Sequence, residues 1–407
     1  MMVKSILFFA DGTWQGADGG NRSNVLALFQ ALAGVNTLGG PRDDEQEKLF
    51  PGSADTPPYV AKYIHGVGDG GNWWSNLVGG AFGAGLIFRV LRGYTFISRQ
   101  YQPGDRIYLI GFSRGAYTVR ALGGLIARMG LLDWAGLGLE NVANNALGQR
   151  YASAAWHNYM VLRKAEEPPA DLFGALQMMI AEGDQQARDA LELTPLYIPD
   201  VAIDTIAVWD TVGAMGIPKP ILMSKARHDY LKFIDNRLSD KVRHGLHAVA
   251  IDERRCDFTP TLWAPRDGVV QCLFAGAHAD VGGGYPDQGD NAALSAIALH
   301  WMAGQLAQDD GTRPGLRFTL NALSERAHLG PSHRPWDLPA YWLRKKSDRE
   351  LPCKDPVMDC THLPYADAVK MRLDQEVTVI SDGWFGRRTI TYRPAPLTAG
   401  GYFSTAK

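Results

Sequence analysis

A β-favouring run that leads through Gly-Phe-Ser-Arg-Gly into a helical pattern limits the fold of this chain more than any other segment. Residues 107–110, Ile-Tyr-Leu-Ile, are apolar and favour a buried strand. The pentapeptide at residues 111–115 follows at once, and apolar residues then recur up to position 129 with helical spacing. A strand, a G-x-S-x-G sequence and a helix in this order are typical of a nucleophile elbow. The segment therefore predicts that Ser113 is a nucleophile.

The turn at this serine has steric and electrostatic requirements that the neighbouring residues meet. A sharp turn from strand to helix strains the backbone, so small residues such as Gly111 and Gly115 must flank the serine. The helix that follows directs its N-terminal amides and the positive end of its dipole toward a developing oxyanion. We therefore expect the backbone N–H of Arg114 to be one oxyanion donor.

Strand patterns and helix patterns alternate along most of the chain. Strands are predicted at residues 5–9, 59–64, 203–209 and 269–274, and helices at residues 25–32, 77–101, 240–252 and 294–306. Residues 36–57 are polar and rich in Gly and Pro, which favours a loop. This alternation predicts an α/β fold with a mostly parallel central sheet flanked by helices. Ligands of such folds bind at the carboxyl ends of the strands.

The chain is predicted to form one domain with insertions. Its 407 residues can bury a large core, and we expect residues 1–407 to fold as a unit. The strand pattern disappears at residues 131–200, where residues 144–164 and 172–193 have helical spacing, so a helical insertion is expected there. The pattern of residues 312–407 is mixed.

Composition argues against several classes of protein. Lys and Arg total 41 and Asp and Glu total 43, so no basic surface for nucleic acid is indicated. The four cysteines lack metal-ligand spacing and indicate no disulfide framework. The N-terminus resembles a first strand rather than a signal peptide, and the glycine-rich run at residues 70–88 would span a membrane poorly. We therefore expect a cytoplasmic protein in the producing cell that needs no metal or other cofactor.

Three residues with complementary chemistry follow predicted parallel strands. Ser113, Asp210 and His278 occur in the chain order of the α/β-hydrolase triad, so an α/β-hydrolase-like fold is expected. The histidine would take the serine proton as the oxygen attacks a carbonyl, and the carboxylate would hold the imidazole in the required tautomer.

Other residues compete for these roles. Asp204 lies in the middle of a predicted strand, and Asp280 is expected to accept hydrogen bonds from the amides of residues 282–284. The rival histidines are placed in helical or loop segments, where packing or solvation is the expected role: His157, His228, His244, His247 and His300.

A second oxyanion donor is expected from the loop after the first strand. Gly12 or Thr13 would provide this amide, because such loops supply the second donor in the triad hydrolases. Asp11 would brace the same loop.

Six short blocks resemble one bacterial and fungal α/β-hydrolase family, long described as a domain of unknown function, that includes the type VI secretion phospholipase effectors. The blocks run in family order and are FADGTW (9–14), GVG (66–68), GFSRGA (111–116), VWDTVG (208–213), IDERR (251–255) and HADVGGGY (278–285). The resemblance places the family's serine, aspartate and histidine at Ser113, Asp210 and His278. It implies hydrolysis of lipid esters, of phospholipase A type in the known effectors.

The function predicted from the sequence is that of a serine esterase acting on lipid esters through an acyl-enzyme. A soluble ester or thioester is the alternative substrate, and a non-catalytic binding protein with this fold is the alternative of another class. A substrate presented by a membrane surface is favoured by two features, the adjacent Trp73 and Trp74 and the loop at residues 213–228. Tryptophan prefers the lipid–water interface, and a loop with apolar and cationic side chains can lie on lipid headgroups. An effector role would add a secretion or immunity partner and export by a contact-dependent secretion system.

Overall fold

The computed structural model describes most of the chain. The described residues are 3–12, 21–40, 43–53, 56–66, 81–140, 146–166, 193–212, 236–309, 315–342, 345–350, 363–383 and 385–399. The predicted helix at 172–193, the pair Trp73 and Trp74, and the loop at 213–228 lie outside these ranges. Within them, every helix is too short or too polar to cross a membrane.

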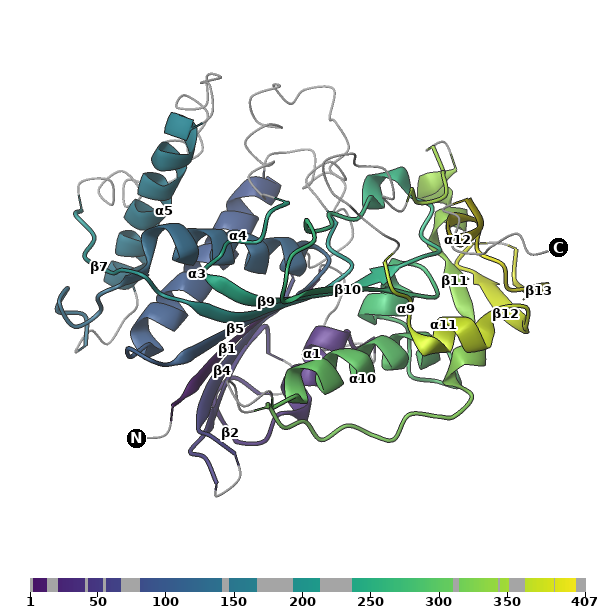
Figure 1. The fold of residues 1–407 in the computed structure, drawn as a ribbon, viewed down its shortest axis with the longest axis horizontal. Coiled ribbons are helices and arrows are strands. Elements are labelled where there is room, and N and C mark those ends of the chain that lie inside the picture. Colours follow the sequence, from purple (N-terminus) through teal and green to yellow (C-terminus); the bar gives the residue numbers. More distant parts are fainter. Residues whose placement is uncertain are drawn as a thin grey trace.

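An eight-stranded sheet runs through the centre of the molecule, in the order β10-β9-β8-β5-β1-β4-β3-β2 (Figure 1). The neighbouring pairs from β10 to β4 are parallel, and β3 and β2 continue the sheet in antiparallel pairing. The strands are β1 (Ser5–Ala10), β2 (Val35–Leu38), β3 (Glu45–Phe50), β4 (Tyr59–Ile64), β5 (Arg106–Phe112), β8 (Ile203–Trp209), β9 (Val242–Ala250) and β10 (Val269–Phe274). The predicted mostly parallel sheet is therefore confirmed.

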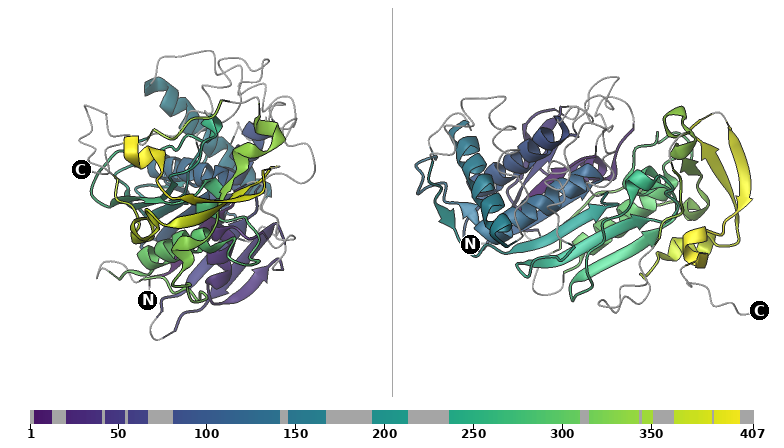
Figure 2. Two further views of the ribbon diagram at one scale, coloured as in Figure 1. Left: turned by 90° about the vertical axis from the view of Figure 1, so that its right-hand side faces the viewer. Right: turned by 90° about the horizontal axis from the view of Figure 1, so that it is seen from above.

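Helices cover both faces of this sheet, as Figures 1 and 2 show. One face packs against α3 (Ala81–Gln100), α4 (Arg114–Met129) and α5 (Ala146–Glu166) through a core that includes Val90 and Leu122. The other face packs against α1 (Asn24–Ala31) and α10 (Ala293–Ala307) through a core that includes Phe29 and Met302. Because each face buries apolar side chains, the central parallel strands are apolar on both sides.

The prediction of a helix at residues 240–252 was wrong. These residues form β9, whose residues from Leu246 to Ala250 are all buried. Val242, Leu246 and Val249 match helical spacing, but a buried parallel strand is apolar at nearly every position, so its periodicity does not distinguish strand from helix. His244 and His247 consequently lie in a strand rather than in a helix or loop.

The prediction that residues 36–57 form only a loop was also wrong, because they contain β3 and most of β2. Their polar composition hid this hairpin, since strands at the edge of a sheet carry charges that discourage further pairing. Glu45 and Glu47 of β3 each lie 3.0 Å from Lys62 Nζ of β4, so these charges are paired across the strands.

The segment at residues 131–200 joins α4 to β8. Its described part contains α5 and a two-stranded pairing of β6 (Leu131–Leu132) with β7 (Tyr197–Ile198), which the sequence did not predict.

The C-terminal region forms a small sheet beside β10, at one end of the molecule in Figure 1. It consists of β11 (Ser332–Arg334), β12 (Glu376–Ser381) and β13 (Arg387–Thr391), with the short helices α11 (Asp367–Arg372) and α12 (Ala395–Ala399). Leu273 of β10 donates to Pro364 O and accepts from Ala366 N, each at 2.9 Å. These bonds cover the open edge of the main sheet.

The turn between β5 and α4 leaves no space for side chains at its glycines. A Cβ atom on Gly115 would lie 2.0 Å from the carbonyl oxygen of Ala10, and one on Gly111 would lie 2.6 Å from that of Gly115. Glycine at both positions lets α4 begin directly against the end of β1.

We expect Gly115→Ala to lower the free energy of unfolding by about 1–3 kcal/mol, because the added methyl group must displace the backbone of β1. Gly304→Ala is the matched control, since a Cβ on this exposed residue of α10 meets no atom within 4 Å. It should stabilise the protein by about 0.4–1 kcal/mol. Urea unfolding measures both effects, and equal stability of the two variants would contradict the close approach at Gly115.

Candidate active site

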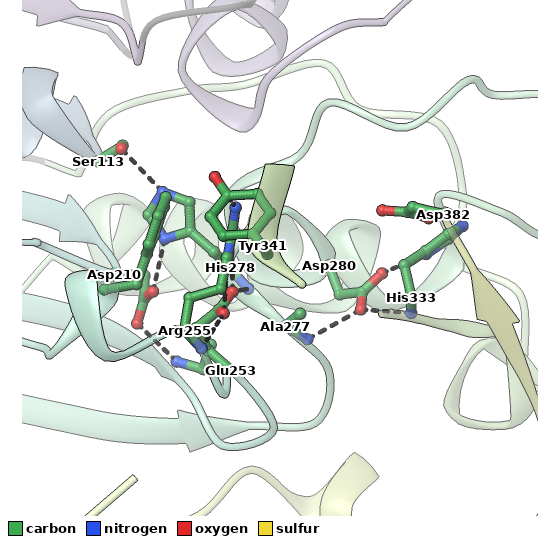
Figure 3. Close-up of polar contacts among 12 residues, drawn as sticks. Ser113, Asp210, Glu253, Arg255, Ala277, His278, Asp280, His333, Tyr341 and Asp382 are labelled. Atoms are coloured by element: carbon green, nitrogen blue, oxygen red, sulfur yellow. Dashed lines mark hydrogen bonds and ion pairs between the residues drawn. The ribbon is translucent and has the colours of Figure 1, made fainter. Parts of the chain in front are cut away.

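Ser113, His278 and Asp210 form one continuous chain of hydrogen-bonding contacts (Figure 3). Ser113 lies between β5 and α4, Asp210 follows β8, and His278 begins the five-residue helix α9 (His278–Gly282). His278 Nε2 is 2.8 Å from Ser113 Oγ, and His278 Nδ1 is 2.6 Å from Asp210 Oδ2. The structure thus brings together the three residues that the sequence selected as nucleophile, base and acid.

Two of these residues have a strained backbone. Ser113 has φ 57° and Asp210 has φ 36°, and only two other non-glycine residues of the described ranges have a positive φ. The strain is held by hydrogen bonds to neighbouring strands, from Ser113 N to Trp209 O at 3.1 Å and from Asp210 N to Ala248 O at 2.8 Å. Strain of this kind is found where the surrounding structure fixes a side chain for function.

The Asp210 carboxylate is fully buried and has more partners than His278 alone. Arg349 donates to it twice, from Nη1 to Oδ1 at 2.6 Å and from Nη2 to Oδ2 at 2.8 Å, and Ala250 N donates to Oδ1 at 2.9 Å. Burial alone would raise the pKa of Asp210, but the charge and hydrogen bonds of Arg349, together with His278, hold that pKa well below its ordinary range. Asp210 is therefore ionised at neutral pH.

Arg349 is a site residue that the sequence did not reveal. It comes from the segment at residues 345–350, and it also donates to the carbonyl oxygens of Ala250 and Phe258, both at 2.6 Å. The planar guanidinium thus fixes the carboxylate and two backbone segments together. No local pattern marks such a residue, because its partner lies 139 positions away along the chain.

The His278 ring is held between two aromatic side chains. The centroids of the Phe112 and Phe258 rings lie 4.6 Å and 4.9 Å from that of the imidazole. Burial lowers the pKa of His278 below its ordinary value of 6.5, while the hydrogen bond and charge of Asp210 act in the opposite direction. The imidazole is therefore neutral at pH 7, which is the form that accepts a proton.

The buried Glu253 fixes the start of α9. Its carboxylate accepts from the His278 backbone N–H at 3.2 Å and from Arg255 Nε and Nη2, each at 2.8 Å. Burial alone would raise the pKa of Glu253, but Arg255 lowers it to about 2. Both residues belong to the Ile-Asp-Glu-Arg-Arg block, which the sequence marked without indicating a role.

Asp280 does not accept hydrogen bonds from the amides of residues 282–284, so that prediction was wrong. Its carboxylate instead accepts from Ala277 N and His333 N, both at 2.9 Å, and lies 2.6 Å from His333 Nδ1 (Figure 3). The helix α9 turns the carboxylate away from the glycines and toward β11. Asp280 therefore connects α9 to the C-terminal sheet and does not contact His278 in any described interaction.

The loop after β1 lies against the nucleophile, but its Gly12 amide is engaged. Gly12 N donates to Asp11 Oδ1 at 2.7 Å, which does not support Gly12 as an oxyanion donor. Asp11 also accepts from Ser23 Oγ at 2.6 Å and from the Tyr63 hydroxyl at 2.7 Å, so it connects the start of this loop to α1 and β4. Thr13 lies outside the described residues. Arg114, the other predicted donor, is the first residue of α4, where the helix dipole favours an anion.

Two arginines, the buried Arg89 and the half-buried Arg114, place positive charge near Ser113. Arg89 Nη2 donates to Asp11 O at 2.6 Å, and Arg114 directly follows the serine. Burial lowers the pKa of Arg114 to about 9, and the nearby charge of Arg89 acts in the same direction. Across the described part of the chain, no three His, Cys, Asp or Glu side chains are grouped to hold a metal ion.

Comparisons with known proteins identify the family of this chain. The family described as the T6SS phospholipase effector Tle1-like catalytic domain matches residues 4–305. The chain belongs to this family. The match contains Ser113, Asp210 and His278 but not Arg349.

Similar proteins are distant and longer. An uncharacterised protein of Saccharomyces cerevisiae is 25% identical over 277 residues, which are 64% of this chain and 33% of the yeast protein. The Tle1 effector solved in complex with the VgrG spike is 16% identical, with a TM-score of 0.34, over 70% of this chain and 51% of the effector. An uncharacterised Pseudomonas aeruginosa protein is 17% identical, with a TM-score of 0.35, over 75% of this chain and 46% of the Pseudomonas protein. The chain thus spans a third to a half of these relatives' lengths.

In this member of the effector family, Arg349→Lys should lower kcat on the order of 10²-fold with little change in KM. Lysine keeps the charge but loses the planar fork that orients Asp210. Arg349→Met should destabilise the fold by about 3–5 kcal/mol, because it leaves a buried carboxylate without its main counter-charge. Lys345→Met, which removes an exposed charge from the same segment, is the control. Steady-state kinetics and thermal melting measure these effects, and a stable, fully active Arg349→Met variant would refute the assignment.

The pH dependence of kcat/KM should report the lowered pKa of His278. Neutral imidazole is the active form, so activity is lost as the pH falls through the pKa of the free enzyme, which lies below the ordinary 6.5. A soluble ester that does not ionise in this range is the substrate for the measurement. If activity were instead lost with a midpoint above pH 6.5, the pKa of His278 would be raised. Asp210 would then affect this pKa more than burial does.

Proposed function

We propose that this protein hydrolyses carboxylic esters of phospholipids, as a phospholipase A-type serine esterase with an α/β-hydrolase-like fold. The observation that carries the proposal is the contact chain from Ser113 Oγ through His278 to Asp210, at the carboxyl ends of parallel strands. The Tle1-like family match supports lipid as the substrate class. The chain order Ser, Asp, His supports the α/β-hydrolase assignment.

The geometry supports a two-step reaction. His278 Nε2 takes the Ser113 proton as Oγ attacks the ester carbonyl, and the proton then passes to the departing alcohol. The backbone N–H of Arg114 would stabilise the oxyanion at the N-terminus of α4. Water, activated by the same imidazole, then releases the fatty acid from the acyl-serine. Asp210 stays ionised throughout and stabilises the imidazolium that forms in each step.

The charge near the nucleophile favours a phospholipid over a neutral lipid or a soluble neutral ester. Arg89 is buried and Arg114 is half-buried, and each keeps a positive charge at neutral pH. A phosphate in the substrate would offset the repulsion between them. A membrane surface as the site of action, and a secretion or immunity partner, are part of this proposal and rest on family membership.

The test is the release of fatty acid from phospholipid vesicles by the purified chain. We expect turnover by the wild type, a loss of about 10⁴-fold or more in kcat for Ser113→Ala, and no loss for Ser53→Ala, which changes an exposed serine. A fluorophosphonate probe should modify the wild type at Ser113 only. Probe labelling without turnover of any phospholipid, but with turnover of a short soluble ester, would favour the alternative substrate class. Absence of both would favour a non-catalytic binding protein.

A further inference from the structure

A cavity of about 150 Å³ lies in the C-terminal region, away from Ser113. It is bounded by β11, β12, β13, the start of α12 and the loop after β9. Four of its lining side chains are arginines: Arg254, Arg334, Arg388 and Arg393. The family match ends at residue 305. Apart from Asp252 and Arg254, all residues that line the cavity lie after this point in the sequence.

The strand register directs two of these arginines to the same side of the small sheet. Ser332 pairs with Val379, and Val379 pairs with Arg388, so the three side chains lie in one row across the strands. Arg334 is two residues beyond Ser332 and therefore shares its face. The floor of the cavity is thus a sheet face that carries two guanidinium groups.

The positive charge at this face is only partly compensated. Arg254 lies 2.9 Å from Asp348, and Arg334 makes a longer contact of 3.5 Å with Asp337. Arg393 forms an ion pair with Asp374. No hydrogen bond or ion pair of the Arg388 guanidinium is found among the described residues. Burial lowers the pKa of Arg334; Asp337 opposes this effect, and the charges of Arg388 and Arg254 add to it. The guanidinium groups are therefore close enough to repel one another.

Two carboxylates line the cavity, and both already have partners: Asp348 pairs with Arg254, and Asp252 accepts two hydrogen bonds. Asp252 Oδ2 accepts from Gly276 N at 2.7 Å and from the Tyr392 hydroxyl at 2.9 Å, and burial raises the pKa of this carboxyl. A buried donor also remains unused, because Trp336 Nε1 has no acceptor among the described residues although its side chain lines the cavity. Both observations favour an anion with several acceptor oxygens as the missing partner.

We propose that this arginine-lined cavity binds the phosphate group of a small phosphate ester, taken either from solution or from the headgroup of a phospholipid. Its volume is close to that of an engineered cavity that holds one benzene molecule, so it admits a phosphate with a small substituent but no acyl chain. Arginine pairs with two phosphate oxygens at once, which gives the site its specificity for phosphate. The proposal concerns binding alone and does not depend on Ser113 as a nucleophile.

The experiment compares Arg388→Gln with Arg387→Gln, both in the Ser113→Ala background so that no lipid is consumed. Both residues are exposed on β13, but Arg387 precedes Arg388 and lies on the opposite face of the strand. The two substitutions remove the same charge, and only one removes it from the cavity. Calorimetry measures binding of inorganic phosphate and glycerol 3-phosphate, and flotation measures binding to phosphatidylglycerol and phosphatidylcholine vesicles.

We expect saturable binding of at least one probe, weakened about tenfold or more by Arg388→Gln and unchanged by Arg387→Gln. Vesicle binding that depends on Arg388 identifies a lipid headgroup as the source. If binding of the soluble probes depends on Arg388 and vesicle binding does not, the natural ligand is a free phosphate ester. The proposal is overturned if no probe binds, or if both variants lose binding equally. Retention of the far-ultraviolet circular dichroism spectrum verifies the fold of each variant.

Discussion

The buried negative charge of Asp210 is the constraint on which the arrangement of this site depends. A lone carboxylate cannot be buried without a large free-energy penalty, so the fold must surround it with donors and a cation. Here the donors come from segments far apart in the sequence: Ala250 at the end of β9, His278 on α9, and Arg349 from the C-terminal region. The burial of this one charge therefore determines how the end of the sheet, His278 and the last quarter of the chain meet.

Sequence patterns predicted the parts of the site that local chemistry determines. Ser113 was found because a G-x-S-x-G turn needs a strand before it and a helix after it, and Asp210 and His278 because strand ends converge at one edge of a parallel sheet. Their hydrogen-bonding contacts agree with that interpretation, although their catalytic roles stay predictions. Several predicted elements were present within a few residues of their expected bounds, because short apolar runs between turn residues mark buried strands and recurrence every three to four residues marks amphipathic helices.

The errors share a physical cause, which is that tertiary contacts leave no local pattern. β9 was taken for a helix because burial on both faces removes the alternation that marks a strand. Arg349 was missed because an ion pair between distant segments has no sequence spacing. The Asp280 carboxylate was given the wrong partner because side chains contact neighbours that only the folded chain brings together. The division of the chain into one domain stays a prediction.

The C-terminal region is joined to the active site through pairs of adjacent residues. Asp348 lines the arginine-rich cavity, while Arg349 holds Asp210; Arg254 lines the cavity, while Arg255 holds Glu253 under His278. Neighbouring side chains on a short segment cannot shift independently, because they share one backbone. The residues that hold the Asp210 carboxylate in place and the residues that line the cavity therefore belong to one packed unit. It follows that the region after residue 305, although outside the family match, is a structural component of the candidate active site.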